Sequence, residues 1–512
     1  MENERRRKRK EMKNNVLDYL AETVLRVPDK TAFSDGTDFL TFSALYQQSR
    51  AVGTWIHKMG IYQKPVVVFM DKHPKTISAF LGVITGGCFY IPVDSEMPAM
   101  RIELILQNAD AKVMICDKNT REAASCLKFS GEIVLYDDIC NTVVEGEELQ
   151  NIHDRTLDTD LIYVVFTSGS TGIPKGVTGC HRSAIDYAEQ LSEVLRFDES
   201  TVFGNQAPLY FDACMKEIYP TLKFGATTYL IPRELFLFPL KLVNFLNEKE
   251  INTLCWVVSA LTMISAFGTF ESIVPQYVRT IAFVGEVFPM KQFQIWKRAL
   301  LDVDYVNLYG PTEATGVCCY YRIDREFACD EAMPVGRPFK NTEILLLNEK
   351  NERAKDGEEG EICIRGTCLA HGYYNDPERT REAFVQNPLN QVYPEMIYRT
   401  GDIGRLNEKG ELMFVSRKDF QIKHMGHRIE LGEIEVYVNM ADGVDTSACV
   451  YDQKRNKIVL YYVGKISEKD LAVSIKERVP RYMIPNAIYR LEKMLYTPNG
   501  KIDRKSLMER MS

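Results

Sequence analysis

Long apolar runs are missing from this sequence of 512 residues. No stretch approaches the roughly 18 consecutive apolar residues that a membrane-spanning helix needs. The first helix-like segment, Val16–Val27, is interrupted by charges, unlike the apolar centre of a signal peptide. Insertion into a membrane is therefore not expected.

Cysteine and histidine patterns typical of disulfide frameworks or zinc sites are missing as well. The 13 cysteines are odd in number and scattered, and no two form a Cys-x-x-Cys pair. This usage is typical of reduced thiols in a cytoplasmic protein. His424 and His427 stand three residues apart, but in a strand-like segment without a nearby cysteine. A zinc site is therefore not expected.

An excess of positive charge is also absent. The chain has 63 Lys and Arg against 70 Asp and Glu, a net charge of −7, which argues against a general nucleic-acid binder. The exception is a basic N-terminal tail, residues 1–13, with the run Arg5–Lys10. We interpret this tail as a solvated segment, with contact to RNA or a membrane surface as the alternatives.

What the sequence does contain is an alternation of short apolar runs with helix-like stretches. Strands are expected at Pro65–Met70, Lys112–Cys116, Glu132–Tyr136, Leu161–Phe166, Thr253–Val258, Arg279–Gly285 and Asp304–Gly310. Helices are expected at Lys75–Ile84, Ser183–Leu195 and Leu240–Glu248. The alternation predicts α/β layers with substantial parallel sheet.

The length exceeds what a single core usually accommodates, so at least two domains are expected. From Glu343 to Gly366 the pattern changes to closely spaced strands, which predicts a β-rich subdomain. A boundary is predicted near Arg417–Asp419. We thus expect a large N-terminal domain, residues 14–417, and a small, mobile α+β C-terminal domain, residues 419–512.

The most informative segment is Phe166–Gly176, with the sequence FTSGSTGIPKG. It follows a predicted buried strand, and its glycines, hydroxyl groups and Lys175 suit the binding of a polyphosphate. The candidate phosphate-binding residues are Thr167, Ser168, Gly169, Ser170, Thr171, Gly172 and Lys175. The loop lacks the closing Gly-Lys-Ser/Thr of a Walker loop. A polar surface loop without a ligand is the alternative.

Five further segments accompany this loop in a fixed order. They are FDACMKEIY (Phe211–Tyr219), NLYGPTEAT (Asn307–Thr315), YRTGDIGR (Tyr398–Arg405), SRKDFQIKHMGHRIELGEIE (Ser416–Glu435) and TPNGKIDR (Thr497–Arg504). With them the chain resembles the adenylate-forming enzymes, and within these the amino-acid adenylation domains of nonribosomal peptide synthesis. FDACMKEIYP, VGEVFP (Val284–Pro289) and the end of the chain soon after Lys501 are most similar to stand-alone D-alanine–carrier protein ligases.

The resemblance implies an ATP site and a set of catalytic residues. Asn307, Tyr309 and Gly310 would hold the adenine, and Asp402 with Arg417 would hold the ribose. Thr312 would bond the α-phosphate, and Glu313 would coordinate Mg²⁺, which prefers hard oxygen ligands. Lys501 would be the catalytic lysine, relieving repulsion between the attacking carboxylate and the α-phosphate. A strand-end core aromatic is the alternative for Tyr309, a turn residue for Asp402, and a surface lysine for Lys501.

A second half-reaction is also implied. In the family the small domain turns about a hinge, matched here by Asp419, after the adenylate has formed. Gly426 matches the glycine that lines the approach of a thiol. The expected partner is a separately encoded carrier protein whose phosphopantetheine thiol takes over the acyl group and releases AMP.

The substrate is expected to be an amino acid because Asp212 matches the residue that pairs with the α-ammonium in amino-acid-activating members. A helix N-cap is the alternative for Asp212. The implied pocket contains Asp212, Ala213, Lys216, Cys255, Ala282, Val284, Leu308, Gly316 and Val317. Most are small or apolar, which favours a modest side chain. Lys216 and Val284 depart from the residues typical of the D-alanine enzymes.

The direction of Lys216 decides between two kinds of substrate. If it points into the pocket, an acidic side chain is favoured, and if it points outward, a small neutral one. Two other functions stay open: an acyl-CoA ligase for an acid without an amino group, and a binding module that has kept only the fold. The protein is expected to act as a monomer.

Overall fold

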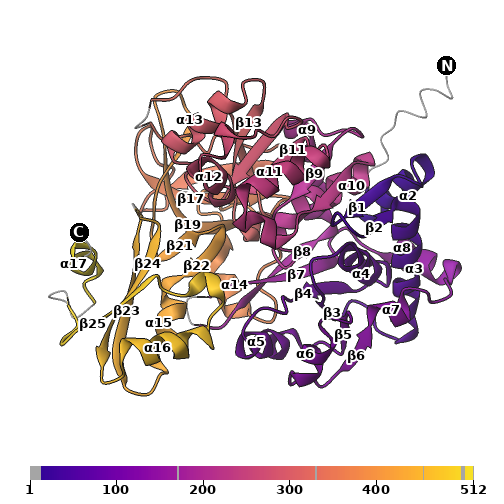
Figure 1. Cartoon of the computed structure of the whole chain (residues 1–512), viewed down its shortest axis with the longest axis horizontal. Helices are drawn as coiled ribbons and strands as arrows, with labels where there is room; N and C mark the ends of the chain where they lie inside the picture. The colour runs from indigo at the N-terminus through magenta and orange to yellow at the C-terminus, as the bar shows by residue number, and fades with distance from the viewer. Residues whose placement is uncertain (1–12, 170–171, 329–330, 454, 497–501, 511–512) are drawn as a thin grey trace.

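The computed structural model describes residues 13–169, 172–328, 331–453, 455–496 and 502–510 (Figure 1). Most of this part of the chain forms helices packed on mixed sheets, so the predicted α/β fold class is confirmed. Of the basic tail, residues 1–12 lie outside the described residues.

A six-stranded sheet contains the strand that leads to the phosphate loop. Its order is β6 (Glu132–Leu135), β5 (Val113–Cys116), β3 (Pro65–Phe69), β4 (Phe89–Pro92), β7 (Leu161–Thr167) and β8 (Lys175–Cys180). All neighbours are parallel except β7 and β8, which form an antiparallel hairpin. Every residue of β3 is buried, as expected for a strand of parallel sheet covered on both faces.

A nine-stranded sheet supports the predicted amino-acid pocket. Its order is β15 (Arg337–Pro338), β14 (Cys319–Arg322), β13 (Asp304–Tyr309), β12 (Thr280–Val284), β11 (Thr253–Val257), β9 (Val202–Asn205), β10 (Thr227–Leu230), β1 (Thr31–Ser34) and β2 (Phe39–Thr41). Strands β11, β12 and β13 run parallel, so their carboxyl ends meet at one edge of the sheet. At that edge of a parallel sheet side chains from several strands can share a site.

One apolar core joins the two sheets. It contains Val66 of the first sheet, Phe203 of the second, and residues of the helices between them such as Phe80 and Leu191. The main helices are α2 (Leu17–Arg26), α3 (Phe42–Lys58), α4 (Pro74–Thr85), α5 (Ala99–Ala109), α6 (Arg121–Cys126), α7 (Tyr136–Ile139), α8 (Gly146–Arg155), α9 (His181–Leu195), α10 (Met215–Phe224), α11 (Pro239–Glu248), α12 (Val258–Ala266) and α13 (Met290–Ala299).

A third, antiparallel sheet forms the predicted β-rich region. It consists of β16 (Thr342–Leu347), β17 (Gly360–Gly366), β18 (Phe384–Gln386), β19 (Met396–Leu406) and β20 (Leu412–Arg417), with α14 (Pro377–Ala383) beside it. Strands β19 and β20 pair so that Asp402 lies opposite Arg417.

The C-terminal elements, yellow in Figure 1, follow β20. They are the hairpin β21 (Gln421–His424) and β22 (His427–Glu430), α15 (Leu431–Asn439), β23 (Val444–Asp452), β24 (Lys457–Gly464), α16 (Glu468–Lys476), β25 (Ala487–Arg490) and α17 (Arg504–Glu509). Tyr462 and Leu471 belong to a core of their own with α15, as expected for a compact α+β unit.

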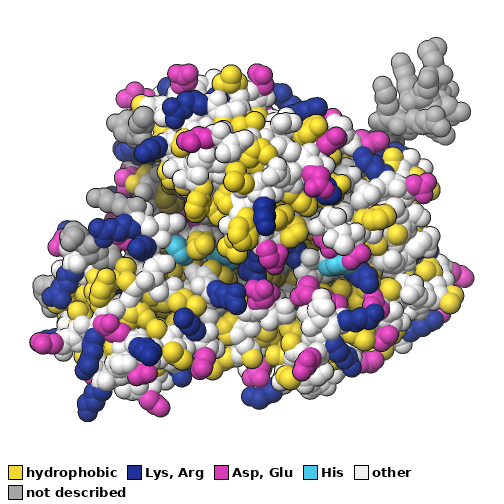
Figure 2. All heavy atoms as spheres, viewed as in Figure 1, with side chains coloured by type: hydrophobic (Ala, Val, Ile, Leu, Met, Phe, Trp, Pro, Cys, Tyr) yellow, Lys and Arg dark blue, Asp and Glu magenta, His cyan; other side chains and the backbone are white. Residues whose placement is uncertain are grey.

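On the face shown in Figure 2, Lys and Arg side chains are interspersed with Asp and Glu. This face therefore presents no continuous basic patch of the kind that binds nucleic acids. Within the described ranges, no helix combines the length and the apolar character that crossing a bilayer requires.

Candidate active site

The predicted phosphate loop is the connection between β7 and β8. Thr167 ends β7 and pairs with Lys175, the first residue of β8. A Cβ atom at Gly169 would lie 2.2 Å from the carbonyl oxygen of Ile173, and Gly172 has φ +83°, so both positions require glycine. Ser170 and Thr171, two of the predicted phosphate ligands, lie outside the described residues.

Glu313 is the centre of a buried charged cluster beside this loop. Its Oε1 accepts hydrogen bonds from Lys175 Nζ (3.1 Å) and from the Tyr373 hydroxyl (2.8 Å). Its Oε2 accepts one from Arg428 Nη1 at 2.6 Å. Glu313 and Thr312 lie in the short helix η4 (Thr312–Ala314), at the carboxyl end of β13. The sequence placed Lys175 and Glu313 in one site, and the fold brings them into contact.

The charges in this cluster determine one another's protonation. Burial alone would raise the pKa of Glu313, but the Arg428 guanidinium and the Lys175 ammonium hold it well below its usual range. Burial lowers the pKa of Lys175, with Arg428 acting in the same direction and Glu313 against it. Glu313 is thus ionised, and it keeps the Lys175 and Arg428 cations next to the phosphate loop.

The residues predicted to bind the nucleoside lie in a second contact group. The Tyr309 hydroxyl donates to Asp402 Oδ2 at 2.5 Å, and the guanidinium of Arg417 bonds the same carboxylate. Lys423 lies 5.7 Å from the centre of the Tyr309 ring. Asn307 donates its amide N–H to the carbonyl oxygen of Pro334 (2.8 Å). In this arrangement Lys423 therefore stands at the ring that was expected to contact adenine.

The hinge candidate Asp419 lies between β20 and β21. Both its oxygens accept hydrogen bonds from Arg417, at 2.7 and 2.8 Å. Burial would raise the pKa of Asp419, and Arg417 outweighs that effect and lowers it. Arg417 thus connects Asp402 to the segment that leads into the C-terminal elements.

The β21–β22 hairpin places the thiol-channel candidate Gly426 at the site. Gly426 has φ +79°, and a Cβ atom there would lie 2.7 Å from Val257 Cγ1, so a side chain would not fit. Its N–H donates to Glu286 Oε1 at 2.9 Å. The Ser168 hydroxyl donates to the carbonyl oxygen of Arg428 at 2.6 Å.

A further contact between distant parts of the chain supports this arrangement. Arg101 on α5 and Glu433 on α15 form an ion pair in which the side chains are 2% and 0% exposed. The other oxygen of Glu433 accepts the N–H of Gly169 at 3.2 Å. The Tyr437 hydroxyl donates to the carbonyl oxygen of Gly172 at 2.9 Å. The phosphate loop is thereby held against α15.

One cavity joins the phosphate loop, the predicted amino-acid pocket and the β21–β22 hairpin. Of the residues predicted to bind substrate or ATP, those that line it are Thr167, Ser168, Asp212, Ala213, Lys216, Val284, Gly310, Thr312, Gly316 and Val317, and Gly426 lines it as well. Cys255, Ala282 and Leu308 are buried in β11, β12 and β13 behind it and are not among its lining residues. Asn307, Tyr309, Asp402 and Arg417 lie outside it too.

Asp212 is the first residue of the short helix η1 (Asp212–Cys214), which precedes α10. No side chain caps η1, and Asp212 Oδ2 has no hydrogen-bond partner within the described part of the chain. Burial raises the pKa of Asp212, while Thr312 and Lys216 oppose the increase. A Cβ atom on Gly316 would lie 3.3 Å from Oδ2, so a side chain at this position would crowd that oxygen.

The catalytic candidate Lys501 lies outside the described residues. Its neighbour Ile502 forms a bridge with Tyr496 and packs in a cluster with Val450 and Tyr461. None of the described residues that line the cavity comes from beyond Tyr482.

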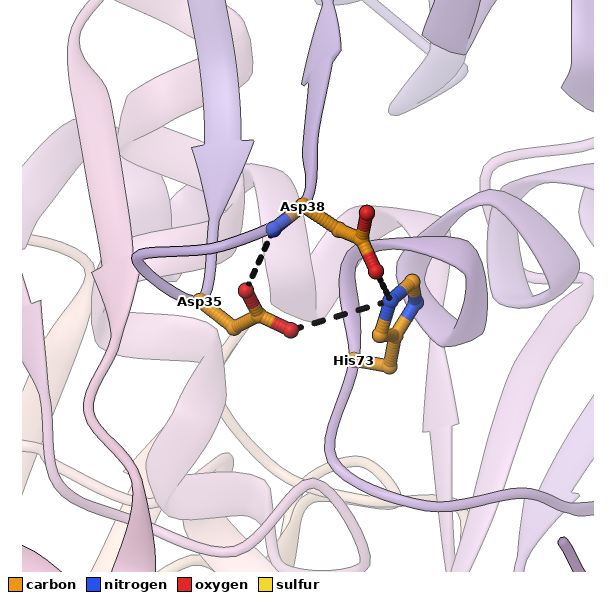
Figure 3. A group of neighbouring side chains, drawn as sticks. All are labelled: Asp35, Asp38 and His73. Atoms are coloured by element: carbon orange, nitrogen blue, oxygen red, sulfur yellow. Dashed lines mark hydrogen bonds and ion pairs between the residues drawn. The ribbon is translucent and has the colours of Figure 1, made fainter.

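Figure 3 shows a second cluster whose side chains are of the metal-binding type: Asp35, Asp38 and His73. His73 Nδ1 accepts the N–H of Lys75 at 3.1 Å, so the proton is on Nε2, which faces Asp38 at 3.1 Å. Asp35 Oδ1 accepts the N–H groups of Thr37 and Asp38, both at 2.8 Å. The cluster closes a turn and caps α4, and its imidazole has no free lone pair for a metal.

Sequence reasoning missed several residues of the site. Arg428 and Glu433 lie within a motif it had singled out, but their partners Glu313 and Arg101 are far away along the chain. Tyr373 lies in a segment without a recognisable pattern. His427, which was considered as a metal ligand, stacks on Tyr482 with 3.8 Å between ring centres, and burial lowers its pKa to about 3.

The comparison with protein families agrees with this geometry. The family model described as AMP-binding enzyme matches residues 20–374. The chain belongs to this family. The D-alanine--D-alanyl carrier protein ligase of Bacillus thuringiensis (strain Al Hakam) is 30% identical over 512 residues, which cover 97% of this chain and 99% of that protein.

One further relative and one solved structure are similar to this chain. Tyrocidine synthase 1 of Brevibacillus parabrevis is 30% identical over 488 residues, 94% of this chain, and the match spans only 44% of that longer protein. The Vibrio cholerae adenylation domain AlmE, solved with glycyl-adenosine-5'-phosphate, has the same fold, with a TM-score of 0.83, 21% identity and 98% of each chain covered.

Proposed function

We propose that this protein activates an amino acid with ATP and transfers it to the phosphopantetheine thiol of a separate carrier protein. The observation that carries the proposal is the buried carboxylate of Asp212, whose Oδ2 has no partner among the described residues and which shares a cavity with the phosphate loop. A carboxylate in such surroundings suits an ammonium group. The carrier-protein ligase among the relatives and the aminoacyl adenylate bound to AlmE support the same reaction.

The first step joins the substrate to AMP. A carboxylate oxygen of the amino acid attacks the α-phosphorus of ATP, the bond from that phosphorus to the bridging oxygen breaks, and pyrophosphate leaves. Thr167, Ser168 and Lys175, with Gly169 and Gly172 shaping the loop, would hold the pyrophosphate. Asp212 would hold the α-ammonium, so that the reacting carboxylate points towards Thr312.

Glu313 is the residue that would hold Mg²⁺. Its carboxylate is ionised, and its Oε2 is bonded by the Arg428 guanidinium. Once Arg428 has moved away, this oxygen would be a suitable ligand for Mg²⁺. When bound, the ion would neutralise negative charge on the phosphates.

The second step transfers the acyl group to sulfur. The thiol sulfur attacks the carbonyl carbon, the bond to the AMP oxygen breaks, and the thiol proton goes to solvent. Gly426 of the β21–β22 hairpin lines the cavity beside Val257, which supports an approach of the thiol along this side. We propose that residues 14–417 and 419–512 are the two domains that rotate about Asp419 between the steps. The described arrangement, with Arg428 on Glu313, would be the one for transfer.

The proposal is tested by ATP–pyrophosphate exchange with amino acids, fatty acids and aryl acids. Amino acids should support the exchange, and acids without an amino group should not. Exchange driven only by the latter would instead favour the acyl-CoA ligase alternative. The roles of the site residues are tested in the same assay by Lys501→Ala, which should abolish exchange. Exchange that survives this substitution would remove Lys501 from the mechanism.

A further inference from the structure

Lys216 is a buried cation in the amino-acid cavity. It is the second residue of α10, only 2% exposed, and it lines the same cavity as Asp212, one helical turn away. Its ammonium donates one hydrogen bond, to the carbonyl oxygen of Ala213 at 2.7 Å. In the parts of the chain that the structure describes, Lys216 takes part in no ion pair. Two of its three N–H groups are therefore available to a ligand.

The buried charges next to Lys216 are the carboxylates of Asp212 and Glu217 and the ammonium of Lys72. Burial raises the pKa of Glu217 to about 7, and Lys216 and, less strongly, Lys72 oppose this increase. The Lys72 ammonium bonds the carbonyl oxygens of Asn205, Gln206 and Ile231 at 3.0 to 3.2 Å. Asp212 balances Lys216 in the free protein. An α-ammonium that binds Asp212 adds a third cation to these two carboxylates, so the buried cluster is left with an excess of positive charge.

Tyr187 adds a second donor at the same cavity. This residue of α9 is 2% exposed and lines the cavity, and its hydroxyl has no hydrogen-bond partner among the described residues. Ala213, Val284 and Val317, which also line the cavity, are apolar and cannot balance a charge. An ammonium with two unused N–H groups and a phenol hydroxyl without an acceptor suit the binding of a carboxylate.

We propose that the amino acid activated by this protein has an acidic side chain, of the aspartate or glutamate class, whose carboxylate pairs with Lys216 and accepts a hydrogen bond from Tyr187. This inference rests on the proposed function and makes it more specific. Asp212 binds the α-ammonium, and Lys216 binds the side-chain carboxylate. A small neutral amino acid would leave two N–H groups of Lys216 and the Tyr187 hydroxyl buried without an acceptor.

The test compares acids with their amides in ATP–pyrophosphate exchange. The wild-type protein is assayed with the L and D forms of aspartate, asparagine, glutamate, glutamine and alanine, and with glycine. At least one acid should exceed its amide and alanine in kcat/KM by about tenfold or more, because a site built for a charged group rejects the isostere that lacks it. A preference for alanine, glycine or an amide would overturn the inference.

Variants show which residues cause the preference for the acid over its amide. Lys216→Met should remove the preference for the acid over its amide, and Tyr187→Phe should reduce it by a smaller factor. Lys241→Met, an exposed position on α11, is the matched control and should leave it unchanged. An unchanged preference in Lys216→Met would overturn the role of Lys216. If that variant does not fold, the wild-type comparison alone decides. If no amino acid supports exchange and another carboxylic acid does, the proposed function itself fails.

Discussion

The charged groups at the phosphate loop and those in the amino-acid cavity are all largely buried but differently partnered. Glu313 has three partners, Lys175, Tyr373 and Arg428, all from this chain. Asp212 and Lys216 leave polar atoms without a protein partner among the described residues. The contacts of Glu313 hold two parts of the chain together. Because buried polar groups without partners are costly, Asp212 and Lys216 are arranged for a ligand.

The largest effect is expected from removing the anchor in the cavity. Asp212→Ala should abolish amino-acid activation, because a buried ammonium that loses its carboxylate costs roughly 3–5 kcal/mol. ATP binding should be largely intact, because the phosphate loop keeps all its contacts. Pyrophosphate exchange and nucleotide binding by calorimetry measure the two effects separately. Equal turnover of the variant and the wild type would refute the role of Asp212 as the ammonium anchor.

A buried ion pair away from the reacting groups, Arg101 with Glu433, allows the contact between α5 and α15 to be tested separately. Arg101→Met leaves Glu433 buried without its cation, and breaking such a pair costs about 3–5 kcal/mol. Since this pair joins α5 to α15, thioester formation should slow at least tenfold while pyrophosphate exchange does not decrease. Hydrogen exchange of α15 should become faster.

The matched control is an exposed ion pair. Arg182 and Asp158 are 50% and 33% exposed, so Arg182→Met should cost no more than about 1 kcal/mol and leave both half-reactions unchanged. If Arg101→Met and Arg182→Met behave alike, the contact between α5 and α15 does not hold the transfer arrangement.

A smaller effect is expected from His181, a buried histidine that is neutral in the folded protein at neutral pH. His181 accepts the N–H of Val16 at Nδ1 (3.1 Å), and burial lowers its pKa from 6.5 to about 4. Between these values the unfolded chain binds the proton and the folded protein does not. The free energy of unfolding should therefore decrease as the pH falls from about 6.5 to about 4, by up to about 1.4 kcal/mol per pH unit from this group.

Denaturant unfolding at a series of pH values measures this slope. In His181→Gln, which keeps a side-chain acceptor but does not titrate, the dependence should be flatter by the amount due to one proton. Identical slopes in the variant and the wild type would show that His181 does not stay neutral in the folded protein.

Local patterns in the sequence predicted the framework of the molecule and part of the site. The apolar run of β3 and the glycine-rich loop are local signals, and both lie where they were expected. The pairs Arg428–Glu313 and Arg101–Glu433 join residues 115 and 332 positions apart, so no local pattern reveals them. Asp402 follows a glycine and could belong to a turn, but the ladder with Arg417 places it in β19.

Thioester formation with free pantetheine shows whether the protein both activates an amino acid and transfers it to sulfur. The protein is incubated with ATP, Mg²⁺ and pantetheine, together with either an amino acid or the same acid without its amino group, such as glutamate against glutarate and alanine against propionate. Mass spectrometry then quantifies AMP and the thioester. Equal amounts of AMP and aminoacyl-pantetheine are expected, and only with a substrate that has the amino group. Thioester formed equally well from the acid without an amino group would contradict the proposed function.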